Sequence, residues 1–303
     1  MGISHSHSVD WHTLFSEDWQ KGWMHSGIVE LTDKRFAFEA PGGGALLFLD
    51  PRTGKIERVE IPVAAAHGIF SVLNGNEESL WICDPGAEPP GQVIKISLLG
   101  EVIDSIQQPI RSSDEVGKWR PTAMTITKDG VKWIADGYGL SLLHRISPTG
   151  EICTFDGSSS GRPFDCPHGV TTLERNGETL IVVADRANKR LVYLDSEGTH
   201  VRNLEGDLLT SPSSLVSRDG VLYVTDLFST IIKVDRDNNL RAVIPSDLKN
   251  GNEGWPNTLN NGEVVGPTLT TGEMNSPHGI SLSKTGEIIF TDWCLGGRVV
   301  KLS

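Results

Sequence analysis

One short pattern occurs three times in the chain: a histidine, a glycine and then valine or isoleucine, followed by a strand-like segment that ends in aspartate. The histidines of the three copies are His67, His168 and His278, and the strand-like segments are residues 80–84, 180–185 and 288–292. Units that recur along a chain and carry the same strand signal are typical of repeat architectures. The pattern therefore restricts the chain to a fold in which equivalent strands occupy equivalent places.

Six units of this kind align on the residue that begins the first strand of each unit. These six residues are Ser26, His67, Thr122, His168, Ser213 and His278. Short β-branched and aromatic runs, separated by turns rich in Gly, Asn and Asp, predict a four-stranded meander for each unit. Six such units predict an all-β fold, a six-bladed β-propeller that occupies residues 1–303 as a single domain.

The sixth unit carries only three strand signals, and the last of them is residues 298–302. A strand-like segment at residues 9–15 belongs to no other unit. We expect this N-terminal segment to complete the last blade as its outer strand, which closes the ring and covers an exposed edge. Two long connections, residues 104–121 and 245–277, are expected to form rims or lids.

The overall charge and the cysteine pattern restrict the partners and the compartment. A net charge of -12 argues against nucleic acid and anionic membranes as partners, so a small-molecule substrate is the expectation. No apolar run has the length of a membrane span, and residues 1–10 lack the apolar centre of a secretory signal. The four cysteines show neither disulfide nor CxxC spacing, which favours a reducing, cytoplasmic compartment.

Histidine alternates with a small hydroxyl residue at the aligned position. The first strand of a propeller blade is the innermost, so the three histidines should meet at the axis with threefold symmetry. Three neutral imidazoles and an open fourth position are typical of catalytic zinc, although other transition metals also bind imidazole. Ser26, Thr122 and Ser213 leave room for the ion and could support its ligands or contact a substrate. Histidines with purely structural hydrogen bonds are the alternative.

A second aligned column stands at the end of the second strand of each unit. It reads Ala40, Asp84, Asp136, Asp185, Asp226 and Asp292. We interpret these aspartates as structural residues that accept backbone N–H bonds in the turn that follows. Support of the ligand histidines is the alternative interpretation.

The residues after these aspartates differ between units, and we expect specificity to lie there. Tyr138 could act as a base near a dication, and Arg186 could bind a carboxylate with both of its N–H edges. Trp293 and Cys294 are further candidates for substrate contact. The alternatives are a tyrosine that only packs over the channel and an arginine paired with a neighbouring aspartate. The histidines outside the aligned column receive no role in the site; they are His5, His7, His12, His25, His144 and His200.

At these positions the chain resembles the peptidyl-α-hydroxyglycine α-amidating lyases (peptidylamidoglycolate lyases), a family within the NHL-repeat propellers. The resemblance is sharpest in the following motifs: Pro121-Thr122, Asp136-Gly137-Tyr138, residues 147–150, Pro167-His168, residues 184–190 and Pro277-His278. It implies zinc on His67, His168 and His278, a catalytic tyrosine at Tyr138 and an active-site arginine at Arg186. The implied reaction cleaves an N-acyl-α-hydroxyglycine, a carbinolamide, into an amide and glyoxylate.

The chain departs from that family at several places. Residues 39–42 contain no arginine where the family has a second one, and Ser276 replaces a methionine. Gly279 stands where the family has an aspartate that binds a structural calcium, so that calcium is not expected. The disulfides of the family are also absent. The fold and the metal triad therefore transfer better than the peptide substrate, and a small cytosolic substrate is the expectation.

Three functions remain open from the sequence. The first is a zinc lyase that acts on a carbinolamide or a related 2-hydroxy acid derivative. The second is a metal-dependent hydrolase of a lactone or cyclic amide, with water as the nucleophile. The third is a non-catalytic NHL-type binding scaffold, which the histidine triad disfavours. Fold alone does not separate the first two.

Overall fold

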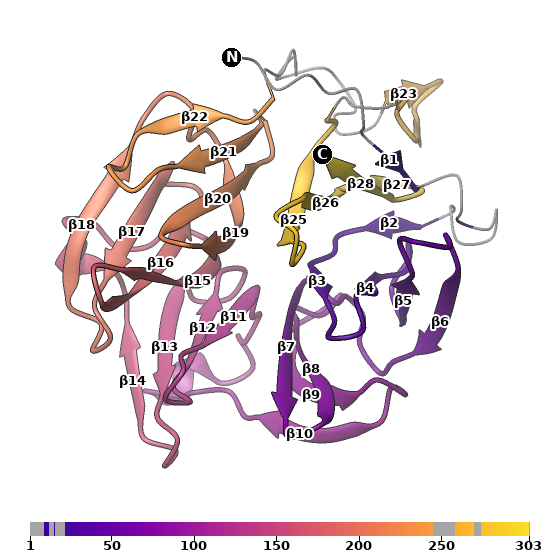
Figure 1. The fold of residues 1–303 in the computed structure, drawn as a ribbon. Coiled ribbons are helices and arrows are strands. Elements are labelled where there is room, and N and C mark those ends of the chain that lie inside the picture. Colours follow the sequence, from indigo (N-terminus) through magenta and orange to yellow (C-terminus); the bar gives the residue numbers. More distant parts are fainter. Residues whose placement is uncertain are drawn as a thin grey trace.

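The computed structural model describes residues 9–11, 15, 22–228, 230–244, 258–269 and 274–302. Within these residues, six four-stranded antiparallel sheets stand around a common axis, as Figure 1 shows. The predicted six-bladed β-propeller is thereby confirmed. No helix in the described part of the chain has the length and apolar character that a membrane span requires. All four cysteines carry free thiols.

Each blade begins at the axis and ends at the periphery. Blade one is β3 (Ile28–Glu30), β4 (Phe36–Glu39), β5 (Ala45–Leu49) and β6 (Ile56–Glu60). Blade two is β7 (Gly68–Asn74), β8 (Glu77–Asp84), β9 (Gln92–Ser97) and β10 (Val102–Ile106). Blade three is β11 (Ala123–Ile126), β12 (Lys132–Asp136), β13 (Leu142–Ile146) and β14 (Ile152–Phe155).

The second half of the ring repeats this order. Blade four is β15 (Pro167–Arg175), β16 (Glu178–Asp185), β17 (Arg190–Leu194) and β18 (His200–Glu205). Blade five is β19 (Pro212–Arg218), β20 (Val221–Asp226), β21 (Ile231–Val234) and β22 (Leu240–Ala242). Blade six is β25 (Pro277–Leu282), β26 (Ile288–Asp292), β28 (Arg298–Leu302) and the N-terminal strand β1 (Val9–Asp10).

Short elements join the blades. A two-stranded ladder of β2 (Trp23–Met24) and β27 (Cys294–Leu295) links blade one to blade six. The connection of residues 104–121 contains the end of β10 and the 3₁₀ turn η3 (Ser113–Glu115), and a second turn, η4 (Ser158–Ser160), follows β14. Of the connection at 245–277, the structure describes mainly the hairpin of β23 (Thr258–Asn260) and β24 (Glu263–Val265). Its predicted role as a lid lies largely outside the described residues.

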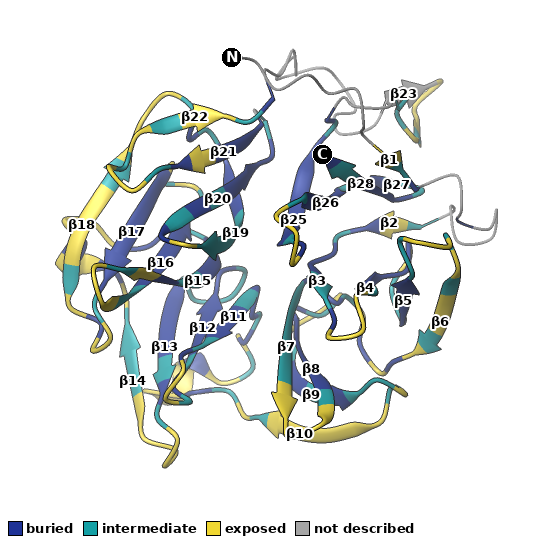
Figure 2. Cartoon of the chain, in the orientation of Figure 1, coloured by how far each residue is buried: buried dark blue, intermediate teal, exposed yellow. Residues whose placement is uncertain are grey.

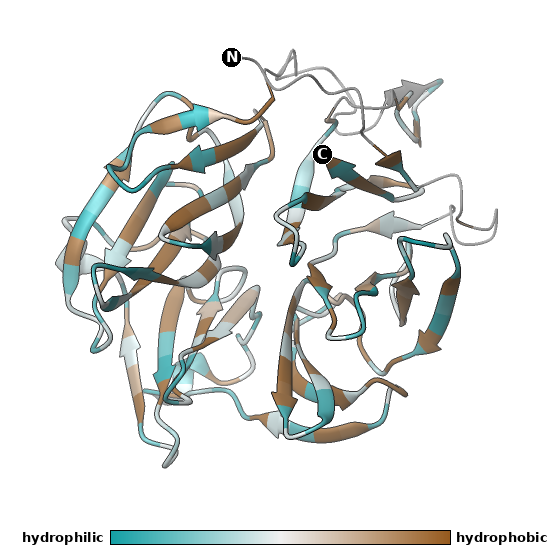
Figure 3. Cartoon of the chain, in the orientation of Figure 1, coloured by the Kyte–Doolittle hydropathy of each residue, from teal (hydrophilic) through white to brown (hydrophobic). Residues whose placement is uncertain are grey.

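The hydrophobic core lies between the faces of neighbouring blades. Leu46 and Phe48 of blade one, for example, share a cluster with Leu80 and Ile82 of blade two. Middle strands are therefore buried on both faces, whereas outermost strands such as β18 and β10 are largely exposed (Figure 2). Hydropathy also decreases from the middle strands to the outermost ones. The strand β20 is mainly hydrophobic, whereas β18 contains both hydrophobic and hydrophilic residues (Figure 3). This packing holds the inner ends of six strands at fixed places around the axis.

The N-terminal strand completes the last blade, as predicted. Val9 pairs with Lys301 and Asp10 with Val300, and the Trp11 amide donates to the carbonyl of Val299 at 3.0 Å. Residues 12–14 of the predicted strand lie outside the described residues.

A buried ion pair accompanies this closure. Arg298 Nε donates to Asp10 Oδ2 at 2.7 Å, and Nη1 donates to Asp292 Oδ2 at 3.2 Å. The side chains of Arg298 and Asp10 are only 1% and 5% exposed. Removing Asp10 would leave Asp292 to compensate the charge of Arg298, but the buried Nε–H would lose this acceptor.

We therefore expect Asp10→Ala to lower the free energy of unfolding by about 1–3 kcal/mol, measured by denaturant titration. Glu205→Ala is the matched control, because Glu205 contacts Arg162 at the same 2.7 Å but both side chains are about half exposed. This control should lose no more than about 1 kcal/mol. Equal stability of the two variants would show that the contact between Asp10 and Arg298 does not stabilise the closed ring.

Candidate metal centre on the axis

The three predicted ligand histidines converge at one end of the axis. His67 directly precedes β7, His168 lies in β15 and His278 in β25, and all three are buried. Their ring centroids are 4.6 Å (His67–His168), 4.7 Å (His67–His278) and 5.2 Å (His168–His278) apart. The alternation along the sequence thus brings three imidazoles from alternate blades into contact.

A fourth histidine, His25, completes the cluster. The ligand atoms of His25, His67, His168 and His278 all lie within 4.8 Å of one another. The expectation that His25 has no part in the site was therefore wrong. The ladder of β2 and β27 carries the segment that ends in His25 across the end of the axis, and the β27 partners of Trp23 and Met24 come from blade six. The sequence feature that could have indicated this role is the position of His25 directly before Ser26 of the aligned column.

Each histidine of the triad is oriented by the next blade. Its Nδ1 atom lies within hydrogen-bond distance of the main-chain carbonyl of the aligned residue one blade further on. The pairs are His67 to Thr122 at 2.7 Å, His168 to Ser213 at 3.2 Å and His278 to Ser26 at 3.1 Å. A carbonyl oxygen only accepts, so Nδ1 carries the proton and Nε2 presents a lone pair. The three small residues thus support the histidines through their carbonyl groups.

The glycine after each histidine allows this carbonyl to approach. A Cβ at Gly68 would lie 2.6 Å from the Thr122 oxygen, and one at Gly169 would lie 2.3 Å from the Ser213 oxygen. At Gly279 the distance to the Ser26 oxygen would be 2.4 Å. These are the same oxygens that accept the Nδ1 protons. The repeated His-Gly pair is therefore one device, in which the glycine admits the acceptor that orients the imidazole.

The cluster is rich in lone pairs and poor in protons. Burial lowers the pKa of His67 to about 3, and burial holds the pKa values of His25, His168 and His278 well below their usual range. The Arg186 guanidinium lowers these pKa values further. Nε2 of His278 has no hydrogen-bond partner among the described residues. Neutral imidazoles that converge through unprotonated nitrogens are the donor set of zinc and related transition metals, so the four-histidine cluster could hold a metal ion.

The two predicted catalytic residues also reach this cluster. Tyr138 follows β12, and its hydroxyl lies 2.9 Å from His168 Nε2, 3.2 Å from His25 Nε2 and 3.3 Å from His67 Nε2. Arg186 follows β16 and donates from Nη1 to the Tyr138 oxygen at 3.2 Å and from Nη2 to the Ser213 hydroxyl. Its Nε is buried without a hydrogen-bond partner in the described part of the chain. A phenol, a guanidinium and four imidazoles thus meet at one point.

The neighbouring candidates occupy the flank of the cluster. The Trp293 ring stacks on His25 with centroids 5.2 Å apart and planes at 28°. Cys294 lies fully buried in β27, and burial raises the pKa of its thiol. His144 bonds to Thr154 and His200 to Asn203, away from the cluster. The remaining histidines, His5, His7 and His12, lie outside the described residues.

Glu39 supports two of the histidines, a role that the sequence analysis missed. Its carboxylate accepts the N–H of Ala66, next to His67, at 2.6 Å, and it also accepts a backbone bond from His25. Burial raises the pKa of Glu39 to about 8. Blade one has Ala40 where the other blades have aspartate. The acidic residue directly before Ala40 could therefore have indicated that Glu39 has a similar role.

The aspartate column anchors the loops that enter the inner strands. Asp84 accepts the N–H groups of Ala64 and Ala65 at 2.9 and 3.1 Å, just before His67, and Asp292 accepts that of Ser276 at 3.0 Å. Asp84 also accepts the N–H of Gly86 in the turn that follows, which was the predicted bond. Within the described residues, no hydrogen bond joins the side chains of this column to those of the three histidines, whose acceptors are carbonyls.

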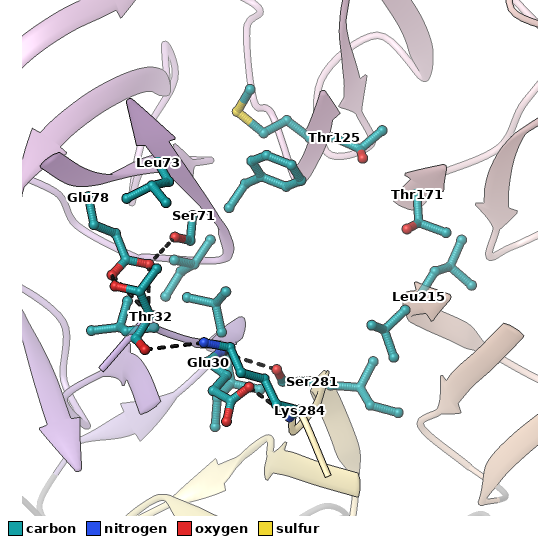
Figure 4. Close-up of a pocket in the computed structure, with 18 of the residues that line it drawn as sticks. Glu30, Thr32, Ser71, Leu73, Glu78, Thr125, Thr171, Leu215, Ser281 and Lys284 are labelled. Carbon is teal, nitrogen blue, oxygen red and sulfur yellow. Dashed lines mark hydrogen bonds between the residues drawn. The ribbon is translucent and has the colours of Figure 1, made fainter. Parts of the chain in front are cut away.

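The axis continues away from the histidines as a narrow passage. Six apolar residues, two positions after the aligned column, surround it: Ile28, Ile69, Met124, Val170, Leu215 and Ile280. The passage, of about 70 Å³, leads to a cavity of about 410 Å³ at the other end of the ring (Figure 4). At that end Glu78 accepts hydrogen bonds from Thr32 and Ser71. An apolar collar therefore separates the histidine cluster from this second cavity.

Comparison with known proteins supports the fold and the repeat type. No protein-family profile matches the chain. NHL repeat-containing protein 3 is 30% identical in Mus musculus and 29% in Homo sapiens, each over 143 residues. The match covers 45% of the chain, and the chain spans only 40% of these relatives. The chain is thus similar to NHL repeat-containing protein 3 over less than half of its length.

Two solved structures share the propeller over nearly the whole chain. A streptogramin B lyase is 18% identical with a TM-score of 0.64, covering 98% of this chain and 97% of its own. A gluconolactonase from Xanthomonas campestris is 13% identical with a TM-score of 0.62, covering 94% and 88%. At these identities the similarity establishes the fold alone.

The His-Gly device makes a direct prediction. Gly169→Ala should displace the Ser213 carbonyl from His168 and weaken the binding of an added metal ion about 10–100-fold, the usual cost of losing the hydrogen bond that orients a ligand histidine. Affinity is measured by competition with a chelator of known strength. Gly206→Ala is the control, because its added methyl group would meet only the flexible end of Leu240. Unchanged affinity in Gly169→Ala would separate the glycine from the orientation of the histidine.

Proposed function

We propose that the chain is a metal-dependent enzyme whose site is the histidine cluster at one end of the axis. The observation that carries the proposal is the convergence of unprotonated Nε2 atoms on the hydroxyl of Tyr138, with the Arg186 guanidinium at the same point. His25, His67, His168 and His278 would hold the metal. A binding scaffold has no need for a buried cluster of this kind, which would cost stability unless an ion satisfied it.

We assign a lyase reaction on an N-acyl-α-hydroxyglycine-like carbinolamide or a related 2-hydroxy acid. The resemblance to the amidating lyases at Tyr138 and Arg186 supports this assignment. When bound, the metal would supply Lewis acidity toward the oxygens of the substrate. In the reaction the substrate O–H and C–N bonds break, a C=O bond forms, and the proton ends on the amide nitrogen. The products are an amide and a 2-oxo acid.

Arg186 is suited to hold the carboxylate of such a substrate. Its Nε lies buried without an acceptor in the described part of the chain, so an incoming carboxylate would satisfy a donor that the protein leaves unused. The hydrogen bonds to Tyr138 and Ser213 fix the guanidinium in place. Two parallel N–H groups then recognise two carboxylate oxygens.

Tyr138 is suited to move the proton. Its oxygen lies at the focus of the imidazoles, where the substrate hydroxyl would also bind. Burial raises the pKa of Tyr138 in the metal-free protein, against a smaller lowering by Arg186. A dication among the imidazoles would reverse this balance and favour the phenolate. The phenolate would accept the hydroxyl proton and return it to the leaving nitrogen.

A hydrolase of a lactone or cyclic amide is the second candidate. The propeller shared with a gluconolactonase favours it, because that fold is thereby compatible with lactone chemistry. The two reactions differ in the source of oxygen. Reaction in ¹⁸O-labelled water would place label in the newly formed carboxyl group for a hydrolase. A lyase would release an amide and a 2-oxo acid whose carboxyl oxygens carry no label, because only the oxo oxygen of that product exchanges with water.

The metal assignment is tested by composition. Purified protein should contain about one metal ion per chain, and His168→Ala should lose it, because a catalytic site depends on each of its few protein ligands. His144→Ala is the control, since His144 is equally buried but lies outside the cluster. Elemental analysis of both variants decides the matter. Full metal content in His168→Ala would exclude the cluster as the site.

The roles of the two polar residues are tested by kinetics. Tyr138→Phe should lower kcat about 10²–10⁴-fold, the range for an acid–base group, while the metal stays bound. Arg186→Ala should act mainly through KM, because it removes a contact to the substrate. Tyr193→Phe, which alters a buried tyrosine of β17, should leave both constants unchanged. Wild-type turnover in Tyr138→Phe would remove Tyr138 from the reaction and favour the hydrolase.

A further inference from the structure

We propose that the phenol oxygen of Tyr138 is itself a metal ligand in the resting protein, beside the four histidines. This inference rests on the proposed metal site and goes beyond it. It concerns which atoms surround the ion before a substrate arrives. A substrate oxygen that later takes this place would leave the phenolate beside it as the proton acceptor.

The distances support a shared coordination sphere. Two donors at about 2.0–2.1 Å from one ion lie about 2.9 Å apart at a right angle and about 3.4 Å apart at a tetrahedral angle. The Tyr138 oxygen is 2.9, 3.2 and 3.3 Å from the Nε2 atoms of His168, His25 and His67. All three separations fall within that interval. The phenol oxygen is therefore spaced from these three imidazoles as donors to one ion are spaced from each other.

The protons of the phenol and of the imidazoles do not satisfy all of these contacts as hydrogen bonds. The carbonyl partners of His67 and His168 leave both Nε2 atoms as acceptors. Tyr138 has one proton for these two lone pairs, and its oxygen already accepts an N–H from Arg186. At least one close contact between oxygen and nitrogen therefore lacks a proton. A cation would satisfy all of these contacts at once, with the phenol proton released to solvent.

The backbone holds Tyr138 in this position. Asp136 accepts the N–H groups of Arg120 at 2.8 Å and Leu140 at 2.9 Å, so it joins the turn that carries Tyr138 to the segment before β11. A Cβ at Gly137 would lie 2.6 Å from the Pro167 carbonyl, so the turn packs directly against the segment that carries His168. A donor fixed in this way is preorganised, as ligands of metal sites generally are.

Copper(II) is the probe, because imidazole sites bind it tightly and a copper–phenolate bond gives a charge-transfer absorption in the visible range. The test uses full-length protein with His5→Ala and His7→Ala, which removes competing ligands near the N-terminus. This protein should hold about one copper per chain and show the absorption. Tyr138→Phe should keep its copper and lose the absorption.

The chain has only three tyrosines, which gives a control that does not depend on the folding of Tyr138→Phe. Protein with both Tyr193→Phe and Tyr223→Phe retains Tyr138 as its only tyrosine and should keep the full absorption. Copper bound without the absorption, or an absorption that persists in Tyr138→Phe, would overturn phenol ligation while the metal site stands. Copper content that is unaffected by His168→Ala would overturn the metal site itself, and phenol ligation with it.

Discussion

The site depends on one hydrogen bond that is repeated three times, from the Nδ1 atom of a histidine to a carbonyl of the next blade. Blade three orients His67, blade five orients His168, and blade one orients His278 through Ser26. The last of these bonds spans the junction between the two ends of the ring. Completion of blade six by β1 and the formation of the histidine cluster are therefore linked, because both need blade six and blade one in their closed arrangement.

The buried polar groups around the axis are divided between two tasks. Carboxylates bind backbone N–H groups, as Asp84 and Glu39 do, and thereby position the segments that carry the histidines. Imidazole nitrogens are left to face one another, with Arg186 as the neighbouring cation. A centre made in this way attracts an ion to its lone pairs and an anionic group to its guanidinium.

Much of the fold and part of the site followed from the repeat. The aligned column predicted the inner strands and the meeting of three histidines, because one position in each blade must face the axis. The positions of Tyr138 and Arg186 followed from the same frame, since both come directly after a strand whose end was marked by aspartate. The last unit has only three strand signals, and its missing fourth strand predicted that the N-terminal strand completes the blade.

Other features arise from contacts that no single unit encodes. His25 reaches the cluster because β2 pairs with β27 of another blade, and two-residue strands leave no periodic signal. Glu39 accepts a backbone N–H bond, as the aspartates of the column do, but it lies one position earlier in its unit. An alignment on the column positions therefore overlooks it. A carbonyl can accept the Nδ1 proton only if neighbouring blades lie close together. In the sequence, this close approach is indicated only by the glycine after each histidine.

The most direct test of this account is the tautomer of the histidines in the metal-free protein. Long-range ¹H–¹⁵N correlation NMR of the imidazole rings distinguishes a proton on Nδ1 from one on Nε2. The account predicts neutral rings protonated at Nδ1 for His67, His168 and His278, because each Nδ1 donates to a carbonyl of the next blade. Rings protonated at Nε2 would contradict it, because those nitrogens would then have no lone pair to offer an ion.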